Sequence, residues 1–122
     1  MDLGLNGQVA LVAASSKGLG RAVATALAAE GAKVMISGRG EPALRETAKE
    51  ISEATGAEVD HHAADLTRAD DIRALVQRTA EPFGGVDVLV TNAGGPPAGT
   101  FGTVGDEDWR SAFELNLMSM VR

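Results

Sequence analysis

An apolar run that ends in a glycine-containing turn and reopens as a helix constrains this chain more than any other feature. The run covers residues 9–14, a polar turn follows at 15–17, and a helical apolar pattern begins at Gly18. Such a junction aims backbone N–H groups and the positive end of a helix dipole at one point, where a phosphate is favourable. Gly18 and Gly20 allow a sharp turn and close approach of a diphosphate to the backbone. The alternative is that they only make a tight loop.

The rest of the chain alternates strand and helix patterns. The expected strands are residues 8–14, 33–37, 57–63 and 86–91, of which 57–63 has the weakest pattern. The expected helices are residues 18–30, 42–55, 68–81 and a last one from residue 106, after a loop at 92–105. This alternation predicts βαβ units and an α/β fold, a Rossmann-type doubly wound parallel sheet with the strand order 3-2-1-4. Ligands of such sheets bind where the strand order reverses, between the loops after the first and fourth strands.

Local signals predict the helix ends and the faces that pack inward. Gly31 and Gly56 end the first two helices. Pro42 suits the first position of the second helix, and Thr67 and Asp70 form a cap region for the third. Residues at helical spacing are expected to face inward. They are Gly20, Val23, Ala24, Leu27 and Ala28, then Leu44, Ala48 and Ile51, then Ile72, Leu75, Val76 and Thr79, and finally Trp109, Ala112, Phe113, Asn116, Leu117 and Met120.

The composition argues against several classes of function. The 122 residues carry a formal net charge of -6, whereas a nucleic-acid surface needs a clustered excess of Lys and Arg. We expect no membrane span and no signal peptide. The absence of cysteine excludes disulfides and thiolate metal sites and fits a cytoplasmic location. His61 and His62 are neighbours on an expected strand, so they point to opposite faces and cannot chelate one ion together.

Two motifs carry a family resemblance. The segment from Ala14 to Gly20, Ala-Ser-Ser-Lys-Gly-Leu-Gly, resembles the Gly-x-x-x-Gly-x-Gly turn of the short-chain dehydrogenase/reductase family. Ala14 stands where the family usually has its first glycine, and alanine fits there only if the turn needs a negative φ. The segment Asn92-Ala93-Gly94 looks like the family's Asn-Ala-Gly motif, although Gly94 could also be an ordinary loop glycine. The resemblance implies cofactor binding by Ala14, Ser16, Lys17, Gly18, Leu19, Gly20, Arg39, Asp65, Leu66, Asn92, Ala93 and Gly94.

The end of the second strand predicts which dinucleotide is preferred. An acid about twenty residues past the glycine turn would accept a hydrogen bond from the ribose and indicate NAD. This chain has Gly38 and Arg39 there. Arginine can bind a 2′-phosphate through two N–H groups and stack on adenine, and Lys17 adds a second positive charge. The combination resembles family members that prefer NADP(H). The alternatives are that Arg39 is a solvated loop residue and that Glu41, the only nearby acid, supports NAD.

Two further polar residues take roles from the resemblance. Asp65 would hold the adenine amino group beside the Leu66 backbone, or it could simply cap the third helix. Asn116 falls on an apolar stripe, where an unpaired amide costs on the order of 1–3 kcal/mol, so it needs partners. Its segment, Glu-Leu-Asn-Leu, resembles the one that holds the family's catalytic asparagine, which bends the helix and holds a water in the proton relay. A structural amide with satisfied hydrogen bonds is the alternative.

The resemblance covers only about the first half of a family member. The family's pattern continues with a serine and then a tyrosine and a lysine four residues apart, and this chain has no tyrosine. We therefore expect residues 1–122 to be the dinucleotide-binding, N-terminal portion of a longer single-domain enzyme, inactive by themselves. The parent reaction implied is hydride transfer between a nicotinamide and a carbonyl or alcohol group.

Several functions remain open at this point. The overall resemblance is nearest to 3-oxoacyl-acyl carrier protein reductases, which implies an acyl-thioester carbonyl substrate and a homo-oligomer, either a dimer or a tetramer. A sugar or small-alcohol dehydrogenase of the same family is the alternative enzyme. A non-catalytic nucleotide-binding module is the alternative of another class. A methyltransferase is disfavoured, because the second strand lacks an acid to hold the ribose hydroxyls.

Overall fold

Four parallel strands form the centre of the protein, in the order β3-β2-β1-β4. They are β1 (Val9–Val12), β2 (Lys33–Gly38), β3 (Val59–Ala63) and β4 (Val88–Val90). The computed structural model describes residues 2–95 and 98–122, so Pro96 and Pro97 of the expected loop at 92–105 lie outside the described residues. The predicted sheet and its strand order are confirmed.

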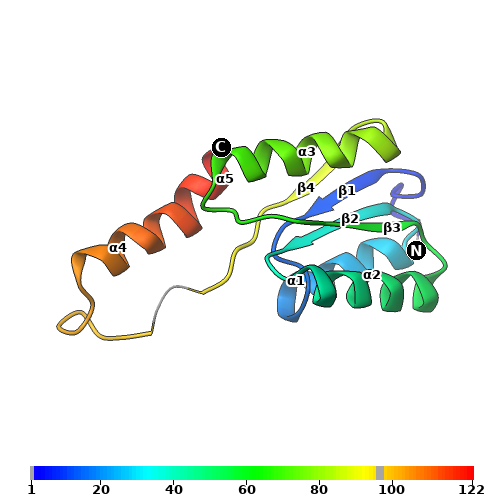
Figure 1. The fold of residues 1–122 in the computed structure, drawn as a ribbon. Helices are drawn as coiled ribbons and strands as arrows, with labels where there is room; N and C mark the ends of the chain where they lie inside the picture. Colours follow the sequence, from blue (N-terminus) through cyan, green and yellow to red (C-terminus); the bar gives the residue numbers. More distant parts are fainter. Residues whose placement is uncertain (1, 96–97) are drawn as a thin grey trace.

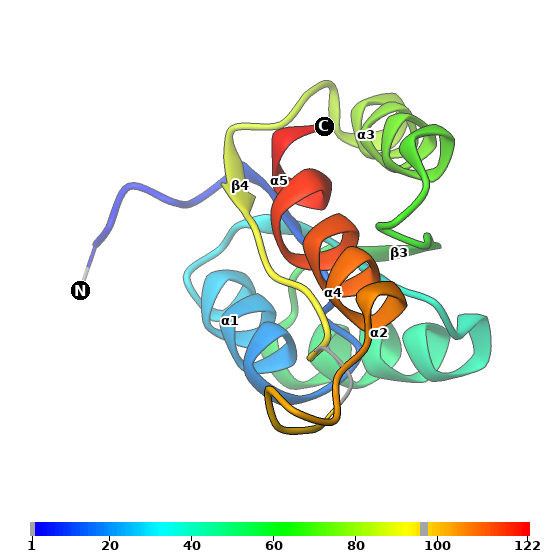
Figure 2. The same ribbon diagram turned by 90° about the vertical axis from the view of Figure 1, so that its left-hand side faces the viewer.

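Helices cover both faces of the sheet (Figure 1). One face packs against α1 (Gly18–Ala29) and α2 (Glu41–Thr55), and the other against α3 (Ala69–Phe83). The last helix begins as α4 (Asp106–Phe113), passes through the π-helical turn η1 (Glu114–Met118) and ends as α5 (Ser119–Val121). Figures 1 and 2 show it beyond the edge toward which the strands point, so it faces the loops that follow them. None of the described helices is long and apolar enough to cross a membrane.

The core has two parts because successive residues of a strand point to opposite faces. Ala10 and Val12 of β1 belong to the cluster under α1 and α2, whereas Leu11 packs with Met35 and Leu75 under α3. β1 is buried along its whole length, as expected for a strand covered on both faces. Asp87 ties the start of β4 to β1, since its N–H donates to the Val9 carbonyl at 2.8 Å and its carboxylate accepts from the Val9 N–H at 2.8 Å.

The ends of several elements differ from prediction for local reasons. β1 ends at Val12 because Ala14 turns into the left-handed region. α2 begins one residue early, so Pro42 is its second residue rather than its first. β3 and β4 are shorter than predicted, and α3 runs to Phe83. Gly31 and Gly56, with φ values of 91° and 76°, lie just beyond the ends of α1 and α2 as predicted.

The predicted cap of the third helix is wrong. Arg68 precedes α3 and makes no side-chain cap hydrogen bond. The Thr67 hydroxyl donates instead to Asp65, and Asp70 pairs with Arg73 at 2.6 Å. A short polar side chain can bond its own turn as readily as a helix end, and here the turn prevails.

Part of the predicted inward-facing set is exposed. Val23 and Val76 are 36% and 45% exposed, although Gly20, Ala24, Ile72 and Leu75 on the same helices are buried. An apolar stripe at helical spacing is wider than the line along which a helix meets a sheet, so its margins reach solvent. The last helix departs further: Trp109, Phe113, Leu117 and Met120 are all about half exposed, at 45–55%. Its opposite face is the one that meets the strand ends.

Candidate functional site

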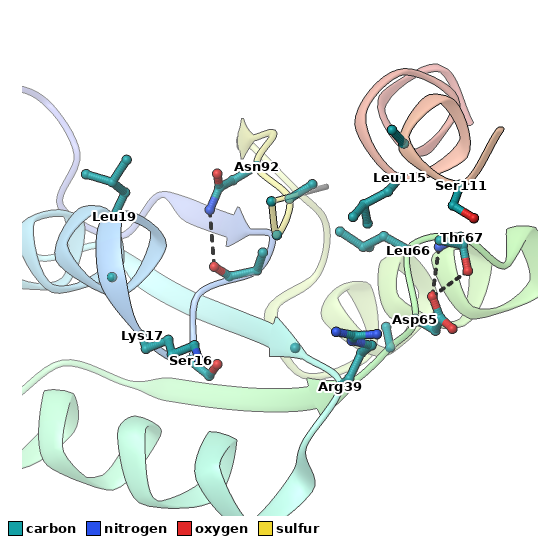
Figure 3. A pocket seen from close by; sticks show the side chains of 18 residues that line it. Ser16, Lys17, Leu19, Arg39, Asp65, Leu66, Thr67, Asn92, Ser111 and Leu115 are labelled. Carbon is teal, nitrogen blue, oxygen red and sulfur yellow. Dashed lines mark hydrogen bonds between the residues drawn. The ribbon is translucent and has the colours of Figure 1, made fainter. Parts of the chain in front are cut away.

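A cavity of about 810 Å³ opens at the carboxyl ends of the strands (Figure 3). The loops after all four strands line it, together with one face of α4 and η1. The lining includes every predicted cofactor residue except Gly20: Ala14, Ser16, Lys17, Gly18, Leu19, Arg39, Asp65, Leu66, Asn92, Ala93 and Gly94. Its volume lies in the range of sites for small molecules and cofactors. The fold therefore brings together residues that are up to 80 positions apart in the sequence.

The glycine turn is built around the Ala14 carbonyl. That oxygen accepts a hydrogen bond from the Asn92 Nδ2 at 3.1 Å, which joins the turn to the loop after β4. Gly20 packs directly behind it, because a Cβ added at Gly20 would lie 2.2 Å from the same oxygen. Gly20 is buried and does not line the cavity. Its role is to let α1 approach the turn closely.

The first turn of α1 is left available to a ligand. Lys17 precedes the helix in extended conformation and makes no side-chain cap hydrogen bond. Gly18, with φ +62°, and Leu19 carry the chain from the turn into the helix and line the cavity. The N–H groups at a helix start lack intrahelical partners and favour an anion. Nothing in the described part of the chain caps this end, so its geometry fits a diphosphate.

Ala14 is strained where the family usually has glycine. Its φ is 49°, the only positive value among the described non-glycine residues. An L-residue in this region costs about 1–2 kcal/mol, so the condition of a negative φ for alanine at this turn is not met. The hydrogen bond from Asn92 to the carbonyl and the packing against Gly20 hold the residue in this conformation.

We expect Ala14→Gly to stabilise the protein. Glycine adopts φ 49° without strain, and this gain outweighs its greater freedom in the unfolded chain, leaving up to about 1 kcal/mol. Urea denaturation followed by circular dichroism measures the free energy of unfolding. Ala13→Gly is the matched control, because Ala13 is buried and has no positive φ, and it should destabilise by about 1 kcal/mol. An A14G protein less stable than the unsubstituted one would contradict the assignment of strain.

Arg39 is a cation of the cavity that forms no ion pair with the described residues. Every other arginine of the described chain lies within 4.0 Å of a carboxylate: Arg21, Arg45, Arg68, Arg73, Arg78, Arg110 and Arg122. Arg39 has no such partner among the described residues, and Figure 3 shows its guanidinium directed into the cavity. Lys17 lines the same cavity and also forms no ion pair within the described part. Two cations that form no ion pair within the described residues suit a ligand that carries phosphate.

Asp65 accepts hydrogen bonds within its own turn and also lines the cavity. Its Oδ1 accepts from the Thr67 hydroxyl at 2.6 Å and from the Thr67 N–H at 2.9 Å. These hydrogen bonds hold the pKa of Asp65 below its usual value, and the nearby Arg39 and Arg68 charges lower it further. Asp65 is therefore a carboxylate at neutral pH, and its Oδ2 makes no hydrogen bond to the described residues. That oxygen can accept from an N–H donor of a ligand.

The sequence predicted only part of the face that α4 and η1 present to the cavity. Ser111, Ala112 and Leu115 line the cavity at helical spacing, and only Ala112 belongs to the predicted inward stripe. The apolar periodicity of the helix is dominated by larger residues that lie on the other, exposed face. Gly38, Ala64, Thr67 and Gly95 also line the cavity and were not predicted to.

Asn116 does not line the cavity. It lies in the π-helical turn η1, is exposed, and donates from Nδ2 to the Ala112 carbonyl at 3.1 Å. The expected burial on the apolar stripe is therefore wrong, whereas the expected hydrogen-bond partner exists, one turn back in the same helix. The π turn does interrupt the helix at this residue, and such interruptions are frequent at functional sites. Its catalytic role stays a prediction.

Metal ligation has no support in the described residues. Within residues 2–95 and 98–122, no three His, Cys, Asp or Glu side chains cluster so as to hold an ion. His61 and His62 occupy neighbouring positions on β3, and His61 contacts Glu41 of α2.

A glycine turn before α1, an uncapped helix start and an Asn-Ala-Gly loop thus meet at one cavity. The model of the short chain dehydrogenase family matches residues 8–122. The chain belongs to this family. The predicted resemblance is confirmed.

Individual relatives match nearly the whole of this chain but less than half of their own length. The putative ketoacyl reductase of Streptomyces coelicolor is 42% identical over 115 residues, which are 94% of this chain and 44% of that protein. L-sorbose reductase from Gluconobacter frateurii, solved with NADPH and L-sorbose, is 36% identical with a TM-score of 0.94, over 99% of this chain and 46% of that one. A substituted actinorhodin polyketide ketoreductase with NADPH is 42% identical with a TM-score of 0.89, over 94% and 44%. The chain spans less than half of the length of these relatives.

Proposed function

We propose that the protein is an NADP(H)-dependent oxidoreductase that transfers hydride between the nicotinamide and a carbonyl or alcohol group, within a chain longer than residues 1–122. The observation that carries the cofactor assignment is Arg39, a cation without an ion-pair partner among the described residues, placed at the end of β2 where an NAD-binding chain would have an acid. Two solved relatives bind NADPH, which supports the same assignment.

Each part of the cavity has a role under this proposal. The start of α1 and the backbone at Gly18 would hold the diphosphate, and Arg39 with Lys17 would hold the 2′-phosphate. Asp65 would accept a hydrogen bond from the adenine amino group beside Leu66. The loop at residues 92–94 would border the nicotinamide ribose. When bound, the nicotinamide supplies or accepts the hydride, and the contribution of these residues is to orient the dinucleotide.

The substrate we propose is a small-molecule or acyl-thioester carbonyl compound, with 3-oxoacyl-acyl carrier protein reduction as the first candidate. The putative ketoacyl reductase and the polyketide ketoreductase among the relatives favour it. A sugar or small-alcohol dehydrogenase, which oxidises the alcohol or reduces the corresponding carbonyl, is the second candidate, favoured by the likeness to L-sorbose reductase. Asn116 is the proposed catalytic residue of this half. The proposal includes a cytoplasmic homo-oligomer, either a dimer or a tetramer, and the absence of activity from residues 1–122 alone, which contain no tyrosine.

Fluorescence titration with NADPH and with NADH tests the cofactor assignment directly. We expect NADPH to bind at least about tenfold more tightly, because charge-assisted hydrogen bonds to the 2′-phosphate are absent with NADH. Equal affinity would overturn the assignment. The longer chain that contains these residues should oxidise NADPH in the presence of a 3-oxoacyl thioester or of a ketose. Tight NADPH binding with neither turnover would favour a non-catalytic nucleotide-binding module instead.

A further inference from the structure

Glu41 is the acid nearest to Arg39 along the chain, and its carboxylate is already held elsewhere. It is the first residue of α2. Its Oε1 accepts from the Nε2 of His61 at 2.9 Å and from the Nη2 of Arg45 at 3.1 Å. A carboxylate only accepts hydrogen bonds, so the Nε2 of His61 carries the proton in this contact. The hydrogen bond from His61 holds the pKa of Glu41 below its usual value.

The position of His61 makes this contact a bridge between separate elements. His61 lies on β3, an edge strand whose register places it opposite Ile36 of β2. Its side chain is 22% exposed, whereas that of Glu41 is 44% exposed. On its other side, His61 is 4.0 Å from the Asp60 carboxylate. Asp60 and His61 also line a second cavity of about 400 Å³, together with Arg78 and Glu81 of α3. The hydrogen bond between His61 and Glu41 thus ties the Glu41 side chain of α2 to strand β3.

Without this contact, Glu41 has a second partner within reach. Residues 39 and 41 are two positions apart, so their Cα atoms lie at most about 7 Å from each other and both side chains are long. An ion pair between them would satisfy the Arg39 guanidinium internally. It would also place a negative charge where a 2′-phosphate must come, and like charges repel there. In the structure this pair is absent among the described residues, and Arg39 stays available.

We propose that His61 is a specificity-determining positioning residue, which binds the Glu41 carboxylate and so keeps it from Arg39. This inference rests on the proposed function, because it concerns the choice between 2′-phosphorylated and unphosphorylated nucleotides at that site. His61 lies outside the nucleotide cavity and acts through Glu41. Arg45 contributes to the same end, but it is 71% exposed and makes the longer of the two hydrogen bonds.

The test uses adenosine 2′,5′-bisphosphate and adenosine 5′-monophosphate as probes, titrated calorimetrically into the full chain. The measured quantity is the ratio of their affinities, since a general structural defect weakens both probes whereas loss of Arg39 weakens only the first. We expect H61A to lower the ratio about threefold to fivefold, because the released Glu41 would form a partly exposed ion pair with Arg39. The H61A/E41Q double variant should restore it, because a neutral residue 41 no longer competes. H62A is the matched control and should leave the ratio unchanged.

Each result of this test either supports or overturns the role of His61. An unchanged ratio in H61A, or a lowered ratio that E41Q does not restore, overturns the role of His61. The E41Q single variant tests the same idea if H61A does not fold: its ratio should equal or exceed that of the unsubstituted protein, and a fall would overturn the proposal. Failure of the unsubstituted protein to prefer the bisphosphate would overturn the proposed function itself, and this inference with it.

Discussion

The R39D substitution is expected to reverse the preference of the protein from NADPH to NADH. Arg39 lines the cavity without an ion-pair partner among the described residues, so its guanidinium can pair with a 2′-phosphate. Losing two charge-assisted hydrogen bonds and adding a like charge should weaken NADPH binding on the order of 10²-fold. NADH should gain up to about tenfold, because the new carboxylate can accept a hydrogen bond from a ribose hydroxyl. Fluorescence titration of both dinucleotides measures the two changes separately.

Two further variants make the R39D result interpretable. R39K keeps the charge but loses the planar fork, so it should weaken NADPH binding by about tenfold and leave NADH binding unchanged. R73D makes the same change of charge at a residue outside the cavity. Arg73 is 74% exposed and pairs with Asp70. The R73D substitution should change neither affinity. An R39D protein that still prefers NADPH would show that the guanidinium is a solvated loop group.

The G20A substitution is expected to cost about 3 kcal/mol of the free energy of unfolding, a large part of what holds a domain of this size folded. The added Cβ would lie 2.2 Å from the Ala14 oxygen and 2.9 Å from the Ser15 Cα, and both are backbone atoms that cannot rotate away. The turn must therefore open. Because the same turn lines the cavity, dinucleotide affinity should fall together with stability. Urea denaturation and NADPH titration of one preparation measure both.

Two other glycines separate this contact from a general intolerance of alanine. Gly18 has φ +62° but no atom within 4 Å of an added Cβ, so G18A should cost only about 1–2 kcal/mol of backbone strain. Gly40 has φ -100° and equally open surroundings, so G40A should change stability by less than about 0.5 kcal/mol. If G20A proves no worse than G18A, the close packing of α1 on the turn is not what stabilises this junction.

Much of the site is predictable from the sequence because its parts are local. The turn at residues 14–20 follows β1 and the Asn-Ala-Gly segment follows β4, and in a parallel sheet the positions after the strands lie at one edge. The placement of Arg39 at the end of β2 follows from counting along one βα unit. These inferences need only the side-chain period, the turn residues and the handedness of crossovers.

Other features depend on contacts between distant elements and could not be predicted. The sequence predicts that the last helix, from α4 to α5, is amphipathic, but its larger apolar face is exposed and the opposite face lines the cavity. The φ of Ala14 depends on the Asn92 amide and on the approach of Gly20, neither of which is visible in the turn itself. Asn116 is satisfied within its own helix, although its position in the apolar pattern indicated burial.

The sequence by itself determined the fold class, the strand order and the residues that gather at the strand ends, because periodicity and turn chemistry act over a few neighbouring residues. Only the tertiary structure decided which charges stay free. Glu41 is nearest to Arg39 in the chain, yet it is bound by His61 from β3, and Asp65 is bound by Thr67 in its own turn. Long charged side chains choose partners by their distance in space, and no pattern along the chain encodes that distance.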